Sequence, residues 1–339
     1  SQVDVSLNGT QITPSMNTYP YRAMIETLLS YGGDAKDSQL TSELFYKDTA
    51  GRMDSVDFQE ATRNGGLYKR SRFTVESHEV DMMGRLHADL FFQERYMLNE
   101  VATKIKLIRS KDVFALMSAN NFHIKIVSAV VYVRKVQLSP SVFLAHAKAL
   151  ERTNAKYPIR RVICKTFTVP AGFLDVSHEK LFSGQIPSRL VIGLVRNDAF
   201  NGAFARNPFN FQHFNLNEIT VYIDGQQQQS IKPLHPDFAN GRYISSYLSL
   251  FSATGKINKD DGNGIDRNEY GSGYALYAFD LSPDLAEDDH FNLSRQGGLR
   301  LVLKFAAALA ATVSVIAYAE FENVVEVDRN RNVIYDFTS

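Results

Sequence analysis

The stretch with the densest set of metal-binding side chains is "NKDDGNGIDRNEYG", residues 258–271. It resembles the calcium-loop pattern D-x-[DN]-x-[DN]-G-x5-E, in which oxygen ligands at alternate positions surround the ion. With the glycines aligned, Asp261 and Asn263 fall on the third and fifth ligand positions. Lys259 occupies the first position, Tyr270 replaces the bidentate acid, and no helical pattern flanks the loop. The sequence therefore favours a solvated, acidic, glycine-rich surface loop over a calcium site.

The eight histidines are scattered, and none forms the i, i+4 pair beside an acid that zinc hydrolases use. His213 lies among aromatic residues in "FNFQHFNLNEI", which favours a hydrogen-bonded packing histidine over a ligand. A G-x-S-x-G elbow, a Walker loop and a G-x-G-x-x-G turn after a strand are absent from the sequence. We therefore assign no catalytic, cofactor-binding or metal-binding residue and no cofactor, and we expect a protein that is not an enzyme.

The lone cysteine, Cys164, alternates with polar neighbours in "RRVICKTFTV" and is predicted to be a buried structural thiol. The 339 residues are 44% apolar and 22% charged, which is typical of a folded protein, and their number favours two domains or two packed halves. Net charge is zero, so contact with nucleic acid would need a local patch. No apolar run reaches the roughly 18 to 20 residues that span a bilayer, so no membrane span is expected.

Two basic clusters are candidates for such a patch, namely "KIKLIRSK" at residues 104–111 and the pair Arg134 and Lys135. Both alternate with apolar residues, which predicts that the charges share one face of a strand whose other face is buried. A solvated face is the favoured interpretation, and an inward patch that faces packaged nucleic acid is the alternative.

Phenylalanine is concentrated in "NDAFNGAFARNPFNFQHFN", residues 197–215. These rings could fill a core beneath long loops, or they could form an apolar patch buried between subunits. The two interpretations are compatible.

Alternation typical of strands recurs along the chain and predicts an all-β sandwich architecture. Two segments instead read as helices, namely residues 21–32, which end at Gly32 and Gly33, and residues 140–153, which open at Pro140. The strand candidates are Val3–Leu7, Thr103–Ile108, Phe122–Val136, Arg160–Val169, Arg189–Val195, Glu218–Ile223, Leu299–Phe305 and Thr312–Val327.

The chain repeats itself in four ordered blocks, which indicates two copies of one β module. "VDVSLNG" at residues 3–9 matches "ITVYIDG" at 219–225, and "YRAMIETLLSYGG" matches "YISSYLSLFSATG", with Tyr21 opposite Tyr243. The later blocks pair "LHADL" with "YAFDL", "TKIKLI" with "LRLVLK", and "FHIKIVSAVVYVRKV" with "ATVSVIAYAEFENVV". The second copy has two strand candidates ahead of its first block, whereas the first copy has none, so we expect about two further strands N-terminal to Val3.

Several long phrases closely resemble the capsid proteins of Polinton (Maverick) elements and the related adintoviruses over essentially the whole chain. These phrases are "YPYRAMIETLLSYG", "LFYKDTAGRMD", "KLIRSKDVFALMS", "FTVPAG", "NPFNFQHFNLNEITVYIDGQ", "GYALYAFDLSPDL" and "AEFENVVEVDRNRNVIYDF". The resemblance implies a double jelly-roll major capsid protein, in which two eight-stranded sandwiches stand side by side. It also implies an N-terminal stretch ahead of "VDVSLNG".

On this basis the expected organisation is a first jelly-roll at residues 1–139, a connector helix at 140–156 and a second jelly-roll at 157–339. The expected partners are two further copies in a pseudo-hexameric homotrimer, neighbouring capsomers, penton or minor capsid proteins, and packaged DNA through non-specific contact. The expected location is the virion, after synthesis and assembly inside the host cell. The alternatives are a minor or penton capsid protein, against which the duplication argues, and a β-sandwich glycan-binding module whose candidate site is the loop from Asp260 to Tyr270.

Overall fold

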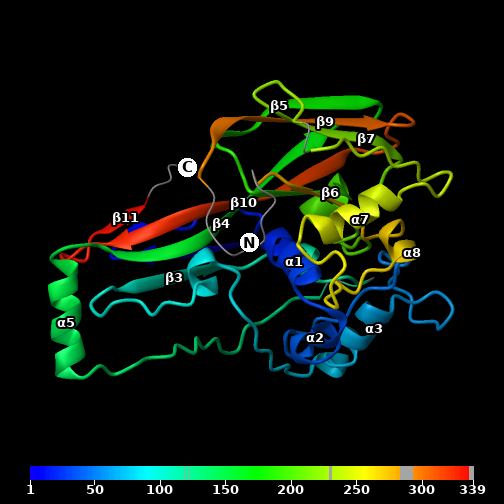
Figure 1. Cartoon of the computed structure of the whole chain (residues 1–339). Helices are drawn as coiled ribbons and strands as arrows, with labels where there is room; N and C mark the ends of the chain where they lie inside the picture. Colours follow the sequence, from blue (N-terminus) through cyan, green and yellow to red (C-terminus); the bar gives the residue numbers. More distant parts are fainter. Residues whose placement is uncertain (119, 121, 229–230, 283–292, 336–339) are drawn as a thin grey trace.

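The computed structural model describes residues 1–118, 120, 122–228, 231–282 and 293–335. Figure 1 shows a β-rich region formed by the second half of the chain, and below it a region of short helices and fewer strands formed by the first half. The described elements are mostly antiparallel strands with short helices, which confirms the all-β prediction.

Two antiparallel sheets make up the second half. The three-stranded sheet has the order β5-β9-β7, with β5 at Asp175–Gln185, β7 at Leu216–Ile223 and β9 at Gln296–Phe305. The five-stranded sheet is centred on β10, which pairs along its full length with β4 on one edge and with β6 and β11 on the other. Its strands are β4 (Ala155–Val169), β6 (Arg189–Arg196), β8 (Leu276–Asp280), β10 (Val313–Val327) and β11 (Val333–Tyr335).

Alternate side chains of β10 enter two different apolar cores, as the two-residue period of a strand requires. Val315 and Phe321 pack in the core between the two sheets. Ile316 and Tyr318 point the other way, to the outer face of the five-stranded sheet. All four side chains are buried, so β10 has no exposed face at these positions.

Two helices cover that outer face. Helix α1 (Tyr19–Ser30) belongs to the first half and contacts β4 and β10, whereas α7 (Ile244–Ser252) belongs to the second half and contacts β8. Pro20 lies in the first turn of α1, where its missing N–H costs no intrahelical hydrogen bond. Helix α5 (Pro140–Leu150) precedes β4. The remaining described helices are short: α2 (Gly33–Asp37), α3 (Gly65–Ser71), α4 (Asp112–Ala115), α6 (Asn197–Asn201), α8 (Arg267–Tyr270), and the 3-10 turns η1 (Gln39–Glu43), η2 (Val75–Ser77) and η3 (Asp89–Phe92).

The first half has one small described sheet, whose register repeats that of the second half. Its order is β2-β1-β3, with β1 at Gln2–Leu7, β2 at Thr10–Gln11 and β3 at Thr103–Ile108. Val5 of β1 is opposite Ile105 of β3, and the duplicated residues Val221 of β7 and Leu301 of β9 are opposite each other in the same way. The duplication read from the sequence is therefore also a duplication of strand pairing.

The turn after each first strand repeats in the same detail. Asn8 and Asp224 both adopt positive φ, of 46° and 52°, and each is followed by a glycine with positive φ. Asn8 Oδ1 accepts a hydrogen bond from the backbone N–H of Ala102 at 2.7 Å, and Asp224 Oδ1 accepts one from Gly298 at 2.8 Å. Asn and Asp tolerate the left-handed region because a short polar side chain can bond nearby backbone, and both turns use that property.

The strand predicted at residues 122–136 does not form in the structure, and this prediction is wrong. The segment runs without helix or strand to the start of α5 (Figure 1). Its counterpart β10 has strands hydrogen-bonded to both edges, whereas in the described first half no strand pairs with residues 122–136. An apolar alternation becomes a strand only where neighbouring backbone takes up its N–H and C=O groups.

The other predicted strands and both predicted helices are present, and four described strands went unpredicted, namely β2, β5, β8 and β11. β2 and β11 have two and three residues, which is too short to show a period. In β5, polar residues interrupt the apolar alternation, so the sequence shows no period of two. The pairing of β5 with β9 also shifts register between His178 and Phe182. β8 is nearly continuously apolar, as expected of a strand buried on both faces, so it also lacks alternation.

The predicted connector helix is present as α5, and β4 begins at Ala155, two residues before the predicted start of the second jelly-roll. The division into two jelly-rolls and a connector stays a prediction, as does the presence of further strands N-terminal to Val3. Two of the apolar cores are shared by both halves: Leu7 and Leu90 pack with Tyr157 and Val325 in one of them.

Candidate functional site

The loop at residues 258–271 has three of its acidic side chains and several of its carbonyls engaged by the protein itself. Lys256 Nζ lies 3.1 Å from Asp261 Oδ1, and Lys47 donates to Glu269 and to the carbonyl of Gly264. Asp266 caps α8 in a reciprocal capping box with Glu269. Lysine ammonium groups thus occupy positions that a cation would need. Helix α7 ends at Ser252, ahead of the loop, and α8 lies within the loop at its C-terminal end, so the expectation that no helix accompanies the loop is wrong.

Lys36 joins this loop to the first half. Its Nζ donates to the carbonyl of Leu28, near the end of α1, at 2.7 Å and also to the carbonyl of Asn263. Burial, together with the positive charges of Lys47 and Lys256, lowers the pKa of Lys36 to about 7. The loop is therefore a contact between the two halves.

The described residues contain no cluster of three or more His, Cys, Asp or Glu side chains that could hold a metal ion. Cys164 is buried, and burial raises the pKa of its thiol to about 12, which confirms the predicted structural thiol. His213 stacks on Phe238 with ring centroids 4.0 Å apart, and its Nδ1 accepts from the N–H of Asn215. Burial lowers the pKa of His213, in agreement with the predicted packing role.

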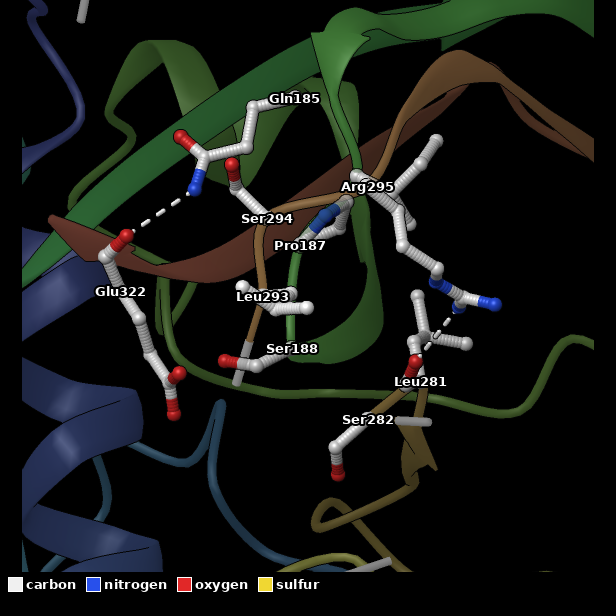
Figure 2. A pocket seen from close by; sticks show the side chains of 10 residues that line it. Gln185, Pro187, Ser188, Leu281, Ser282, Leu293, Ser294, Arg295 and Glu322 are labelled. Atoms are coloured by element: carbon white, nitrogen blue, oxygen red, sulfur yellow. Dashed lines mark hydrogen bonds between the residues drawn. The ribbon is translucent and has the colours of Figure 1, made fainter. Parts of the chain in front are cut away.

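Hollows in the described surface are small. The two best formed have volumes of about 20 and 30 Å³, room for one or two water molecules. Figure 2 shows the smaller hollow, where Gln185 donates to the carbonyl of Glu322 at 3.0 Å and Arg295 donates to that of Leu281 at 2.8 Å. The side chains of Gln185 and Arg295 are thus bonded to backbone carbonyls of the protein. Neither hollow has the size of a small-molecule site.

In the basic clusters the apolar side chains are exposed as well as the charged ones, contrary to the prediction of one buried face. Leu107 and Ile108 in β3 are 54% and 40% exposed, and the apolar residues around Arg134 and Lys135 are exposed as well. The reason is that β3 pairs only with β1 among the described strands, and residues 122–136 pair with none.

The phenylalanine-rich segment lies between the halves and fills a core. Tyr21 of α1 stacks on Phe200 at 5.4 Å and meets Phe209 edge-on at 5.6 Å. Phe114 of α4 meets both Tyr21 and Phe209 edge-on. Rings from the second half thus pack against helices of the first half. These rings therefore fill a core, which was the first of the two interpretations.

A buried ionic network at the same junction was missed by sequence reasoning. In α1, Arg22 lies 2.9 Å from Glu26 and 2.6 Å from Asp89, both measured between side-chain atoms. Asp89 also accepts from the backbone N–H of Val162 in β4 at 3.2 Å, and the Tyr318 hydroxyl of β10 lies 3.4 Å from Glu26. The network therefore connects α1 and η3 of the first half to the central strands of the second.

The charges in this network are balanced by their neighbours. Burial would raise the pKa of Glu26, but Arg22 and His87 together lower it below its usual value. Complete burial raises the pKa of Asp89, although Arg22 opposes the rise. Removing one member of such a buried set leaves an uncompensated charge. The charges are therefore balanced only when α1 docks in the geometry observed here.

One sequence signal could have identified this network, namely the difference between the duplicated helices. Arg22 and Glu26 occupy the positions of Ile244 and Leu248 in the repeat of α1 at α7. A charged pair at i, i+4 where the repeat has two apolar residues marks a surface whose surroundings differ between the copies.

With the geometry established, comparison with known structures identifies the fold. A chain in the 3.5 Å cryo-EM structure of the Sputnik virophage matches with a TM-score of 0.56 and 11% identity, over 99% of this chain and 73% of that chain. A chain of the quasi-atomic PBCV-1 virus capsid matches over 99% and 83% at 9% identity, but its TM-score of 0.43 is too low to add to the comparison. The fold is a double jelly-roll of the viral capsid kind, which confirms the predicted fold class.

Sequence comparison gives a relative whose name states no activity. The uncharacterized protein F54H12.2 of Caenorhabditis elegans is 26% identical over 329 residues, which cover 94% of this chain and 75% of that protein. No protein-family model matches the sequence. Among the described helices, none has both the length and the apolar character needed to cross a membrane.

Proposed function

We propose that this chain is a major capsid protein of a virus or virus-like transposon and that its function is structural, with no catalytic activity. The observation that carries the proposal is the duplicated β module with repeated strand register, in a fold shared with a chain of the Sputnik virophage. The phrases listed above support a relationship to Polinton elements and adintoviruses. The protein is then located in the virion, after synthesis and assembly in the host cell.

Three copies form the proposed capsomer. Two similar modules in each copy give such a trimer a nearly six-fold outline, so one protein can tile a flat facet against identical neighbours and against penton or minor capsid proteins. The same duplication argues against a penton role, which a single module would serve. No observation favours glycan binding, and Asp261, Asp266 and Glu269 of the candidate loop are engaged by lysines or by α8.

Solution mass tests the proposal directly. Light scattering on the purified protein should give a stable species of three times the 38.1 kDa chain mass. A species that stays monomeric at high concentration would contradict it and would move the glycan-binding module to the front.

Packaged DNA is a further proposed partner. Residues 101–156 contain two acidic residues, Asp112 and Glu151, and ten basic ones: Lys104, Lys106, Arg109, Lys111, Lys125, Arg134, Lys135, Lys148, Arg152 and Lys156. The chain as a whole is neutral, so this segment carries a local excess of positive charge. Affinity for duplex DNA of any sequence should fall steeply between 50 and 200 mM salt, and binding that ignores salt would contradict the contact.

A further inference from the structure

The junction between the two halves of one chain provides a template for a contact between two chains. Helix α1 lies between its own half, through Asp89, and the second half, through β4 and β10. On the β10 side, Glu26 of α1 faces Tyr318, and Tyr318 in turn donates to Glu320 at 2.8 Å. The contact is polar at its centre, and it is buried.

In the second half, α7 occupies the position of α1 but lacks the second neighbour. It packs on β8, the counterpart of residues 86–90, as α1 packs on Asp89. Ile244 and Leu248, the counterparts of Arg22 and Glu26, are 37% and 42% exposed. The face of α7 that would meet a strand equivalent to β10 is therefore apolar and uncovered.

The counterpart of the outer face of β10 is also apolar and uncovered. By the repeat, Ile316, Tyr318, Glu320 and Glu322 correspond to residues 127, 129, 131 and 133, which are Val, Ala, Val and Val. Val127, Val131 and Val133 are 67%, 52% and 66% exposed. Within one chain, Glu26 of the charged pair on the helix meets the Tyr318 hydroxyl beside Glu320. In the repeat, the apolar pair on the helix is matched by the apolar segment 127–133, which is not a strand in this structure.

We propose that the outer face of α7, centred on Ile244 and Leu248, packs on residues 127–133 of a second copy, as α1 packs on β10 within one chain. The inference rests on the proposed trimer and names the contact that builds it. Such a contact joins different surfaces of the two copies, so three repeats around a three-fold axis close a ring and leave neither surface free. Burial of these side chains, which are exposed among the described residues, supplies the driving force.

Two experiments on the full chain test the contact. Leu248→Glu places a charge where the apolar helix face meets the neighbour, and light scattering should show the trimer lost in favour of monomer. Leu174→Glu is the matched control, because Leu174 is 53% exposed on the turn between β4 and β5, away from the contact. The control variant should keep the trimer mass.

The second experiment is a chemical cross-link between copies. Leu248→Cys and Ala129→Cys replace the counterparts of Glu26 and Tyr318, which meet through the tips of long side chains. A bismaleimide reagent that spans the gap between the shorter cysteine side chains should therefore link the double variant into dimers and trimers. Leu248→Cys alone should give none, because Cys164 is buried. If Leu248→Glu still forms the trimer and the double variant gives no cross-link, this contact is wrong and the proposed capsomer stands. A monomeric unsubstituted chain would instead overturn the proposed function itself.

Discussion

Strand β10 and residues 122–136 have matching patterns and opposite surroundings. Ile316 in β10 is fully buried, whereas Val127 at the corresponding position is 67% exposed. The apolar content of the two segments is similar, so composition does not explain the difference. What differs is the presence of strands on both edges of β10 and of a helix from the other half over its outer face. A central strand is thus a property of its neighbours as much as of its own residues.

The first prediction sharpens that comparison at a matched pair of positions. Ile316→Ala should lower the free energy of unfolding by about 2–5 kcal/mol, because it leaves a cavity in a packed core. Val127→Ala should change it by less than about 0.5 kcal/mol in the isolated chain, where the side chain contacts solvent. Urea denaturation of both variants measures the difference. Equal losses at the two positions would show that residues 122–136 are buried in solution.

A second prediction concerns the lysine that joins the halves. Burial lowers the folded-state pKa of Lys36 to about 7 from an ordinary value of 10.5, so between these values the unfolded chain binds more protons than the folded one. Stability should therefore rise with pH across this window through Lys36, by at most about 1.4 kcal/mol per pH unit for one proton. Urea midpoints from pH 7 to 10 check this. Lys36→Met should remove that part of the rise, and an unchanged profile would contradict the assignment.

The third prediction uses the duplicated turns, which the two halves share. Asn8→Ala and Asp224→Ala each remove a side-chain acceptor for a backbone N–H and place alanine at positive φ. Each should cost roughly 1 kcal/mol of stability, and the two costs should agree within about 0.5 kcal/mol. Thermal unfolding of the two variants provides the test. A loss of stability at Asp224 alone would show that the two turns, although alike in geometry, contribute differently to stability.

The sequence by itself determined much of the local architecture. Alternation located β1, β3, β4, β6, β7, β9 and β10, because one face of each strand or both are apolar with a period of two. The repeat aligned Val5 with Val221 and Ile105 with Leu301, and the sheet registers follow that alignment. The sequence also contains no zinc-hydrolase, Walker or nucleophile-elbow motif.

Only the tertiary structure decided which groups meet across the halves. The contact of Arg22 with Asp89, 67 positions away, and of Lys36 with Asn263, 227 positions away, depends on how α1 and the loop at 258–271 dock. Such long-range pairs have no local period, and the cost of burying a charge is offset only once its partner is in place. The same reasoning applies to residues 122–136: the pattern specifies a surface that can pair, and the surrounding backbone decides whether it does.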